Sequence, residues 1–187
     1  MRKMITMALL ATLAVSISGC SVDASSDKEV TNVTDADKEY AKQLEEDNSP
    51  YKWQYSSYED EMTSEKTMVA TIQSTDVAQF EFPYNGGSTF TLNIRTKGKK
   101  VDAWVQISKG QIVTDFSNPI IVFRADDNDA VNYGVSESSD YDPTIRFINN
   151  PTSLIAALKN CTSFKIQCPF FNEGSHVFRF ANENFLN

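Results

Sequence analysis

The sequence holds few of the residues that build common catalytic and metal sites. It has a single histidine, His176, and three cysteines in 187 residues. Zinc sites combine several Cys and His ligands, and histidine is the most frequent general acid or base. Cations are also scarce, with 17 Lys and Arg against 25 Asp and Glu and a net charge of -8. Because nucleic-acid affinity comes mainly from cations on phosphates, we expect no nucleic-acid partner. Because histidine and cysteine are scarce, we also expect no Cys/His metal site, and we expect no cofactor.

The first twenty residues have the pattern of an export signal. A basic start, Met1-Arg2-Lys3, precedes an uncharged apolar run over 4–17 and the sequence Ile17-Ser18-Gly19-Cys20. A basic segment, an apolar segment and small residues before a cleavage point define a secretory signal. The run is too short for a membrane-spanning helix, which needs about 20 residues. We predict a signal peptide over 1–19.

The end of this segment resembles the lipobox of bacterial lipoproteins, in which an aliphatic residue and two small residues precede a cysteine. The resemblance implies that Cys20 carries acyl chains (palmitate among them) and becomes the mature amino terminus. Two or more acyl chains anchor a protein stably in a bilayer. Residue 21 is Ser and not the Asp that favours retention at the inner membrane in enteric-type lipoproteins. The resemblance therefore implies the outer membrane, facing the periplasm.

Residues 20–50 have the composition of a tether. The stretch 21–50 contains nine acidic residues and three lysines, which give it a charge of -6, and it contains one aromatic residue. Such a segment buries too little apolar surface to offset its ordering entropy. As a coil of thirty residues it would span roughly 30 Å. We predict that it holds a single globular domain, residues 51–187, clear of the lipid.

The domain has the alternation of polar and apolar residues that is typical of half-buried strands. We predict strands over 77–82, 89–95, 101–108 and 111–116, joined by glycine turns into an antiparallel meander. A more buried strand follows at 120–124. A helix beginning at Pro151 leads into strands over 163–171 and 176–183. The predicted fold is mainly β: an antiparallel β-sandwich, or alternatively a meander covered on one side, with one packed helix.

Strand phase also predicts which residues form the core. One face of the successive strands carries a set of large apolar residues that we expect to be buried together: Phe90, Leu92, Ile94, Val105, Phe164, Ile166 and Phe178. Phe82 shares the apolar face of the run 77–82, and Trp53 and Tyr55 share a face near the start of the domain. We predict that these three are core residues as well.

Several landmarks recur in a group of uncharacterised bacterial exported proteins that the domain resembles. They are Trp53-x-Tyr55, Asp60-x-Met62, Phe82-Pro83-Tyr84-x-Gly86-Gly87, Lys109-Gly110-Gln111 and Phe178-x-Phe180. They span roughly residues 53–185 and consist of turns and core aromatics. The resemblance implies a fold class, and it implies no reaction.

Trp104 is the most informative side chain for function. Its strand buries Val101, Ala103, Val105 and Ile107, so Trp104 points to the opposite face, beside Thr89, Thr91 and Asn93. A tryptophan on such a face suits a partner protein or a sugar ring. At its rim lies a cationic hairpin formed by Arg95, Lys97, Lys99 and Lys100. We predict this face as the partner-binding surface; the alternatives are that the helix or a loop covers Trp104, and that the cations only solubilise the hairpin tip and guard a sheet edge.

Two further groups of residues leave alternatives open. Cys161 and Cys168 form a disulfide in one alternative, which an oxidising periplasm permits. In the other they are separate thiols, which the extended chain between them favours. Asp126, Asp127 and Asp129 lack the spacing of a calcium loop, and we predict a polar turn.

These observations favour one function over two others. No general acid–base set is assembled from motifs, so we predict that the protein is not an enzyme. The favoured function is a membrane-anchored, periplasm-facing lipoprotein whose β domain binds a protein or glycan partner; an immunity or inhibitor role belongs to this class. The alternatives are an envelope hydrolase with an unrecognised carboxylate site and a structural spacer.

Overall fold

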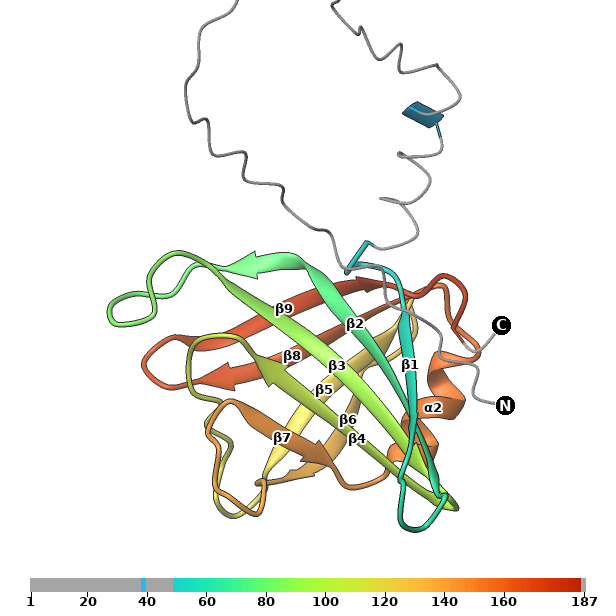
Figure 1. Ribbon diagram of the computed structural model, residues 1–187. Coiled ribbons are helices and arrows are strands. Elements are labelled where there is room, and N and C mark those ends of the chain that lie inside the picture. The colour runs from blue at the N-terminus through green and yellow to red at the C-terminus, as the bar shows by residue number, and fades with distance from the viewer. Residues whose placement is uncertain (1–37, 40–48, 186–187) are drawn as a thin grey trace, which may run out of the picture.

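The computed structural model describes residues 38–39 and 49–185. The predicted signal peptide, Cys20 and most of the tether lie outside these residues. The domain contains nine strands and one helix (Figure 1). They are β1 (Gln54–Glu59), β2 (Lys66–Ala78), β3 (Ser88–Lys97), β4 (Lys100–Ile107), β5 (Ile120–Ala125), β6 (Val131–Ser136), β7 (Ile145–Ile148), α2 (Pro151–Leu158), β8 (Ser163–Phe170) and β9 (Gly174–Ala181).

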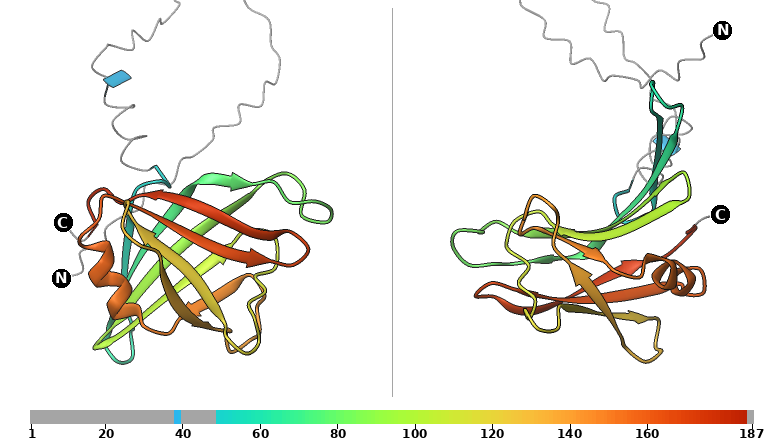
Figure 2. Two further views of the ribbon diagram at one scale, coloured as in Figure 1. Left: turned by 180° about the vertical axis from the view of Figure 1, so that it is seen from behind. Right: turned by 90° about the horizontal axis from the view of Figure 1, so that it is seen from below.

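The nine strands form one antiparallel sheet with the order β1-β2-β3-β4-β7-β6-β5-β8-β9. The sheet curls over itself, so its two halves face each other as two layers (Figure 2). Side chains close part of the seam between the halves: the backbone N–H of Arg179 in β9 donates to the Asp76 carboxylate at 2.7 Å, where β2 is bulged. The predicted class, mainly antiparallel β with one packed helix, is confirmed.

The core lies between the two layers. Phe90 of β3 stacks on Phe178 of β9 with ring centroids 4.3 Å apart, and Phe164 stacks on Phe180 at 4.5 Å. All seven residues predicted to be buried together are at most 6% exposed, which confirms the strand phases. Helix α2 begins where expected, with the Asn150 side chain accepting from the Ser153 N–H, and it buries Leu154 and Leu158.

Some predicted elements are wrong. Strand β2 ends at Ala78, so the alternation predicted through residue 82 stops early and Phe82 is exposed instead of buried. Residues 111–116 form no strand; only Ile112 pairs, in an isolated bridge to Phe170. The strands β1, β6 and β7 and most of β2 were not predicted. Tyr55 is exposed because the edge strand β1 lies beyond the second layer, whereas Trp53 is buried as expected and donates to Asn182 Oδ1 at 2.8 Å.

Candidate functional site

Trp104 occupies the outer face of the sheet, as its strand phase predicts. Its neighbours Ala103 and Val105 are buried in the core, whereas the Trp104 side chain is half-buried on the opposite side. Across the strand pairs, Trp104 lies between Asn93 of β3 and Phe147 of β7. Helix α2 directs Leu154 and Leu158 into the core, and the side chains in contact with the Trp104 ring are those of Phe147 and Arg95.

Two neighbours fix the Trp104 ring. The ring centroid of Phe147 lies 5.8 Å away, and the guanidinium carbon of Arg95 lies 5.7 Å from the indole centroid. Arg95 is itself held by Asp102, whose carboxylate accepts from Nη2 at 2.6 Å and from Nε at 3.1 Å. A cation over an indole face is attracted by the ring quadrupole. The Arg95 side chain therefore shields part of the indole from solvent.

The predicted cationic hairpin is only partly assembled with Trp104. Arg95 contacts the indole, but Lys97, Lys99 and Lys100 lie at the exposed tip of the β3–β4 hairpin. Lys97 is paired with Glu65 at 3.5 Å. The remaining face is a polar ladder, in which the Thr71 hydroxyl donates to Asn93 Oδ1 at 2.8 Å and the Asn93 amide donates to Thr91 Oγ1 at 3.1 Å.

A second surface, which the sequence did not predict, lies at one end of the sheet. Because consecutive strands are antiparallel, four connections meet there: 79–87, 108–119, 137–144 and 171–173. We call these four connections the loop end. In Figure 1 they project to the left and lower left, away from α2.

The loop end carries four strongly exposed aromatic side chains. Their exposed fractions are 104% for Phe116, 87% for Phe82, 77% for Tyr141 and 53% for Phe171. Val113, on the same connection as Phe116, is also exposed. Single exposed apolar residues are common, but a gathering of them on neighbouring loops marks a contact surface. The available sequence signal was weak: Phe116 stands among the turn-forming residues Asp115, Ser117, Asn118 and Pro119.

Hydrogen bonds join these loops to one another. The Phe171 N–H donates to the Gln111 carbonyl at 3.0 Å, and the Gln111 side chain donates to the Tyr84 hydroxyl at 2.9 Å. The Ile112 N–H donates to the Pro143 carbonyl at 2.8 Å. Gly110 packs so closely on the Phe80 ring that an added Cβ would lie 2.7 Å from it. The segment 108–119 is therefore held against each of the other three loops.

A buried arginine lies beneath the loop end. Arg146 of β7 points inward, and its guanidinium donates to the main-chain carbonyls of Ile112 and Ile145. Nη2 lies 3.7 Å from the Glu137 carboxylate, while Nε has no partner among the described residues. Buried charges are expensive unless paired or hydrogen-bonded. Arg146 therefore braces the two loops that carry Phe116 and Tyr141.

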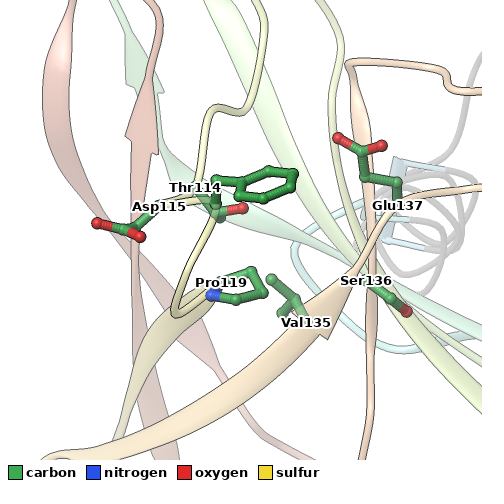
Figure 3. A pocket seen from close by; sticks show the side chains of 7 residues that line it. Thr114, Asp115, Pro119, Val135, Ser136 and Glu137 are labelled. Carbon is green, nitrogen blue, oxygen red and sulfur yellow. The ribbon is translucent and has the colours of Figure 1, made fainter.

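Two hollows flank the segment 108–119. One, of about 240 Å³, lies between this segment and the end of β6; Figure 3 shows Glu137 across it from Thr114, with Pro119 and Val135 below them. Phe116 and Ser136 also line it. The other, of about 210 Å³, is lined by Phe82, Pro83, Tyr84, Gln111, Phe171, Asn172 and Glu173. Both hollows combine aromatic rings with polar side chains.

The two cysteines of the domain are free thiols. Cys168 is fully buried on β8, and burial raises the pKa of its thiol to about 12. Cys161, half-buried after α2, contacts the Leu158 carbonyl oxygen at 3.7 Å. Burial and then the nearby Asp126 carboxylate raise the Cys161 pKa. Neither thiol has the depressed pKa of a reactive cysteine.

Asp126 has a structural partner. Its carboxylate accepts hydrogen bonds from the N–H groups of Ser163 and Thr162, and the Ser163 bond is the largest cause of its lowered pKa. Within residues 38–39 and 49–185, no group of three or more His, Cys, Asp or Glu side chains is placed to hold a metal ion. In the same residues, no helix is long and apolar enough to cross a membrane.

No family model, curated protein or solved structure matches the chain. The resemblances stated from the sequence, to lipoprotein signals and to a group of exported proteins, therefore stay predictions.

Proposed function

We propose that this protein is a membrane-anchored, periplasm-facing lipoprotein, without enzymatic activity, whose β domain binds a partner protein through the loop end. The lipobox-like Ile17-Ser18-Gly19-Cys20 and the acidic tether support the anchoring. A protein partner is favoured over a glycan because the exposed groups of the loop end are mainly large aromatic rings spread over several loops. Such rings dominate the energetics of protein interfaces.

The observation that carries the proposal is the exposure of Phe82, Phe116, Tyr141 and Phe171 on one end of the domain. An aromatic side chain that stays exposed to water lacks the stabilisation of about 1.5–3 kcal/mol that full burial would give. Binding residues are concentrated on loops that a rigid scaffold positions. The loop end has this form, since the curled sheet supports four loops that are bonded to one another.

The braced loops also favour tight binding. Ordering a mobile side chain or loop at an interface opposes association by about 0.5–1.5 kcal/mol for each side chain immobilised. Here Arg146 and the Gln111 contacts already hold segment 108–119. The backbone of this segment is therefore ordered before a partner arrives.

The outer face around Trp104 is the second surface for the same function. The indole offers contact area, but Arg95 and Phe147 already take part of it. Trp104 also lacks the strong exposure of the rings at the loop end. We therefore place the main contact at the loop end and treat Trp104 as the rival location.

Native gel electrophoresis of mildly solubilised envelopes tests the proposal. Wild-type protein should migrate in a complex larger than itself, and the variant Phe82→Ser/Phe116→Ser/Phe171→Ser should migrate alone while keeping its thermal midpoint. The matched control is Tyr58→Ser/Met62→Ser, which alters two exposed residues of β1 and the β1–β2 connection, away from the loop end. A complex that survives the triple change but is lost in Trp104→Ala would contradict the loop-end proposal.

A further inference from the structure

The charge of the domain is concentrated at the loop end. Residues 51–187 contain sixteen acidic and twelve basic residues, a net charge of -4. The four connections of the loop end alone contain six acidic residues and one lysine, a net charge of -5. Their acidic residues are Glu81, Asp115, Glu137, Asp140, Asp142 and Glu173, and the lysine is Lys109. The connections that carry the exposed aromatic rings thus also carry a net negative charge.

The loop end does little to neutralise this charge itself. The Lys109 ammonium donates hydrogen bonds to the main-chain carbonyls of Asn85 and Gly86. Among the described residues, one ion pair lies at this end, between Arg146 and Glu137 at 3.7 Å. In that pair the arginine is buried, but the Glu137 side chain is 60% exposed. Glu137 therefore keeps accepting capacity that faces solvent.

We propose that the partner protein presents a basic segment to the loop end and places a lysine or arginine side chain in the hollow beside Glu137. This inference rests on the proposed function and names the chemistry of its partner. The hollow's volume of about 240 Å³ equals roughly eight waters at about 30 Å³ each, enough for one long side chain. The acidic field also favours a basic partner over other proteins before contact.

The lining of the hollow suits a cation at its tip and an apolar stem behind it. Glu137 supplies carboxylate oxygens, and Thr114 and Ser136 supply hydroxyls that accept from an ammonium or a guanidinium. The Phe116 ring offers a face that attracts cations, and Pro119 offers apolar contact to the stem, whereas Val135 lies at the base of the hollow and is almost fully buried. Asp115 also lines the hollow, and its Oδ1 already accepts from Ser117 and Asn118.

The same charge argues against a bilayer as the occupant. Exposed phenylalanines on loops also enter lipid, but anionic headgroups repel a surface with a charge of -5. The chain also joins the domain elsewhere, beside β1, where the Gln73 N–H donates to the Pro50 carbonyl. We therefore favour a protein over a bilayer as the occupant, and the vesicle-binding measurement below distinguishes the two.

Fluorescence anisotropy with dye-labelled peptides tests this inference on the full chain in detergent. The probes are a fourteen-residue amphipathic peptide of lysine and leucine, and the same peptide with glutamine for lysine. We expect the lysine peptide to bind at least tenfold more tightly, with an affinity that falls as salt is added. Glu137→Gln and Phe116→Ser should each weaken it at least fivefold, whereas Glu61→Gln, at the opposite end, should leave it unchanged.

The remaining outcomes are separable. Equal affinity for both peptides, with loss in Phe116→Ser, would overturn the basic-partner inference and leave the proposed function standing. Lysine-peptide affinity that is insensitive to both Phe116→Ser and Glu137→Gln would overturn the assigned hollow. Binding of the protein to phosphatidylcholine–phosphatidylglycerol vesicles (3:1), lost in Phe116→Ser, would assign the surface to a bilayer instead. Thermal midpoints of each variant show whether a loss of binding is a loss of fold.

Discussion

The guanidinium of Arg146 donates a hydrogen bond to the main-chain carbonyl of Ile112, 34 residues earlier in the chain. This bond ties a buried strand residue to the long connection between β4 and β5. The same guanidinium reaches the carbonyl of Ile145 and lies beside Glu137. The inward-facing Arg146 thus supports both sides of the hollow that Phe116 and Glu137 line.

Arg146→Met should lower the free energy of unfolding by about 1–3 kcal/mol for each buried carbonyl left without a donor. Chemical denaturation monitored by tryptophan fluorescence measures this. Arg124→Met is the matched control, because Arg124 also donates to two main-chain carbonyls but is exposed. Equal small losses in the two variants would show that Arg146 braces nothing.

The stacked core predicts a second stability effect. Leu92 and Ile166 are fully buried on β3 and β8, in opposite layers of the curled sheet. Truncating either to alanine should lower the free energy of unfolding by about 2–5 kcal/mol, through lost burial and a residual cavity. Met62→Ala, at an exposed position, should change it little. Unfolding that is unaffected by Leu92→Ala would contradict the packing described here.

Long alternating segments made this fold class predictable. The side chains of β3 and β4 alternate between apolar and polar, and the glycine between the strands marks their turn, so the strand phases and the buried apolar residues follow from the sequence. The burial of the polar Asn93 does not. β2 was mostly missed because its buried positions include the small or polar residues Thr67, Ala70 and Ser74, and because a bulge between Gln73 and Val77 breaks its period. β7 was missed because it is short and its pattern is inverted: the charged Arg146 faces inward.

The candidate surfaces were predictable to different degrees. Period two alone places Trp104 on the outer face, but it does not show that Arg95 covers the indole. The alternation of polar and apolar residues did not predict the loop end, because the curling of the sheet brings together residues as distant in sequence as Phe82 and Phe171. Their exposure depends on where strands end, and β2 ends four residues before Phe82.

Cys168 should resist thiol reagents in the folded protein. With its pKa raised to about 12 by burial, the thiol is protonated at pH 8. In a Cys161→Ser background, Ellman's reagent should label Cys168 only after denaturant is added. The raised pKa also determines how stability depends on pH. The contribution of Cys168 to the free energy of unfolding is greatest below the ordinary thiol pKa of 9.0 and falls as the pH rises from 9.0 towards 12. Cys168→Ala should flatten that alkaline decline; rapid labelling of the native thiol would refute its burial.

Cys20→Ser should abolish lipidation and leave the precursor uncleaved or missorted, because the proposed acyl acceptor is gone. Metabolic labelling with a clickable fatty-acid analogue, followed by gel fluorescence, measures this. Ser21→Asp is a useful companion, since it should keep the label and shift the protein towards the inner membrane. Label that persists in Cys20→Ser would rule out the proposed anchor.

Site-specific photocrosslinking in intact cells tests the central proposal most directly. A photoreactive phenylalanine analogue is placed, one position at a time, at residues 116, 82, 104 and 62. We predict a discrete protein adduct of the same mass from positions 116 and 82, and none from position 62 at the far hairpin. The position 116 adduct should disappear when Glu137→Gln is added. Adducts from position 104 without any from 116 or 82 would contradict the account and move the partner to the outer sheet face.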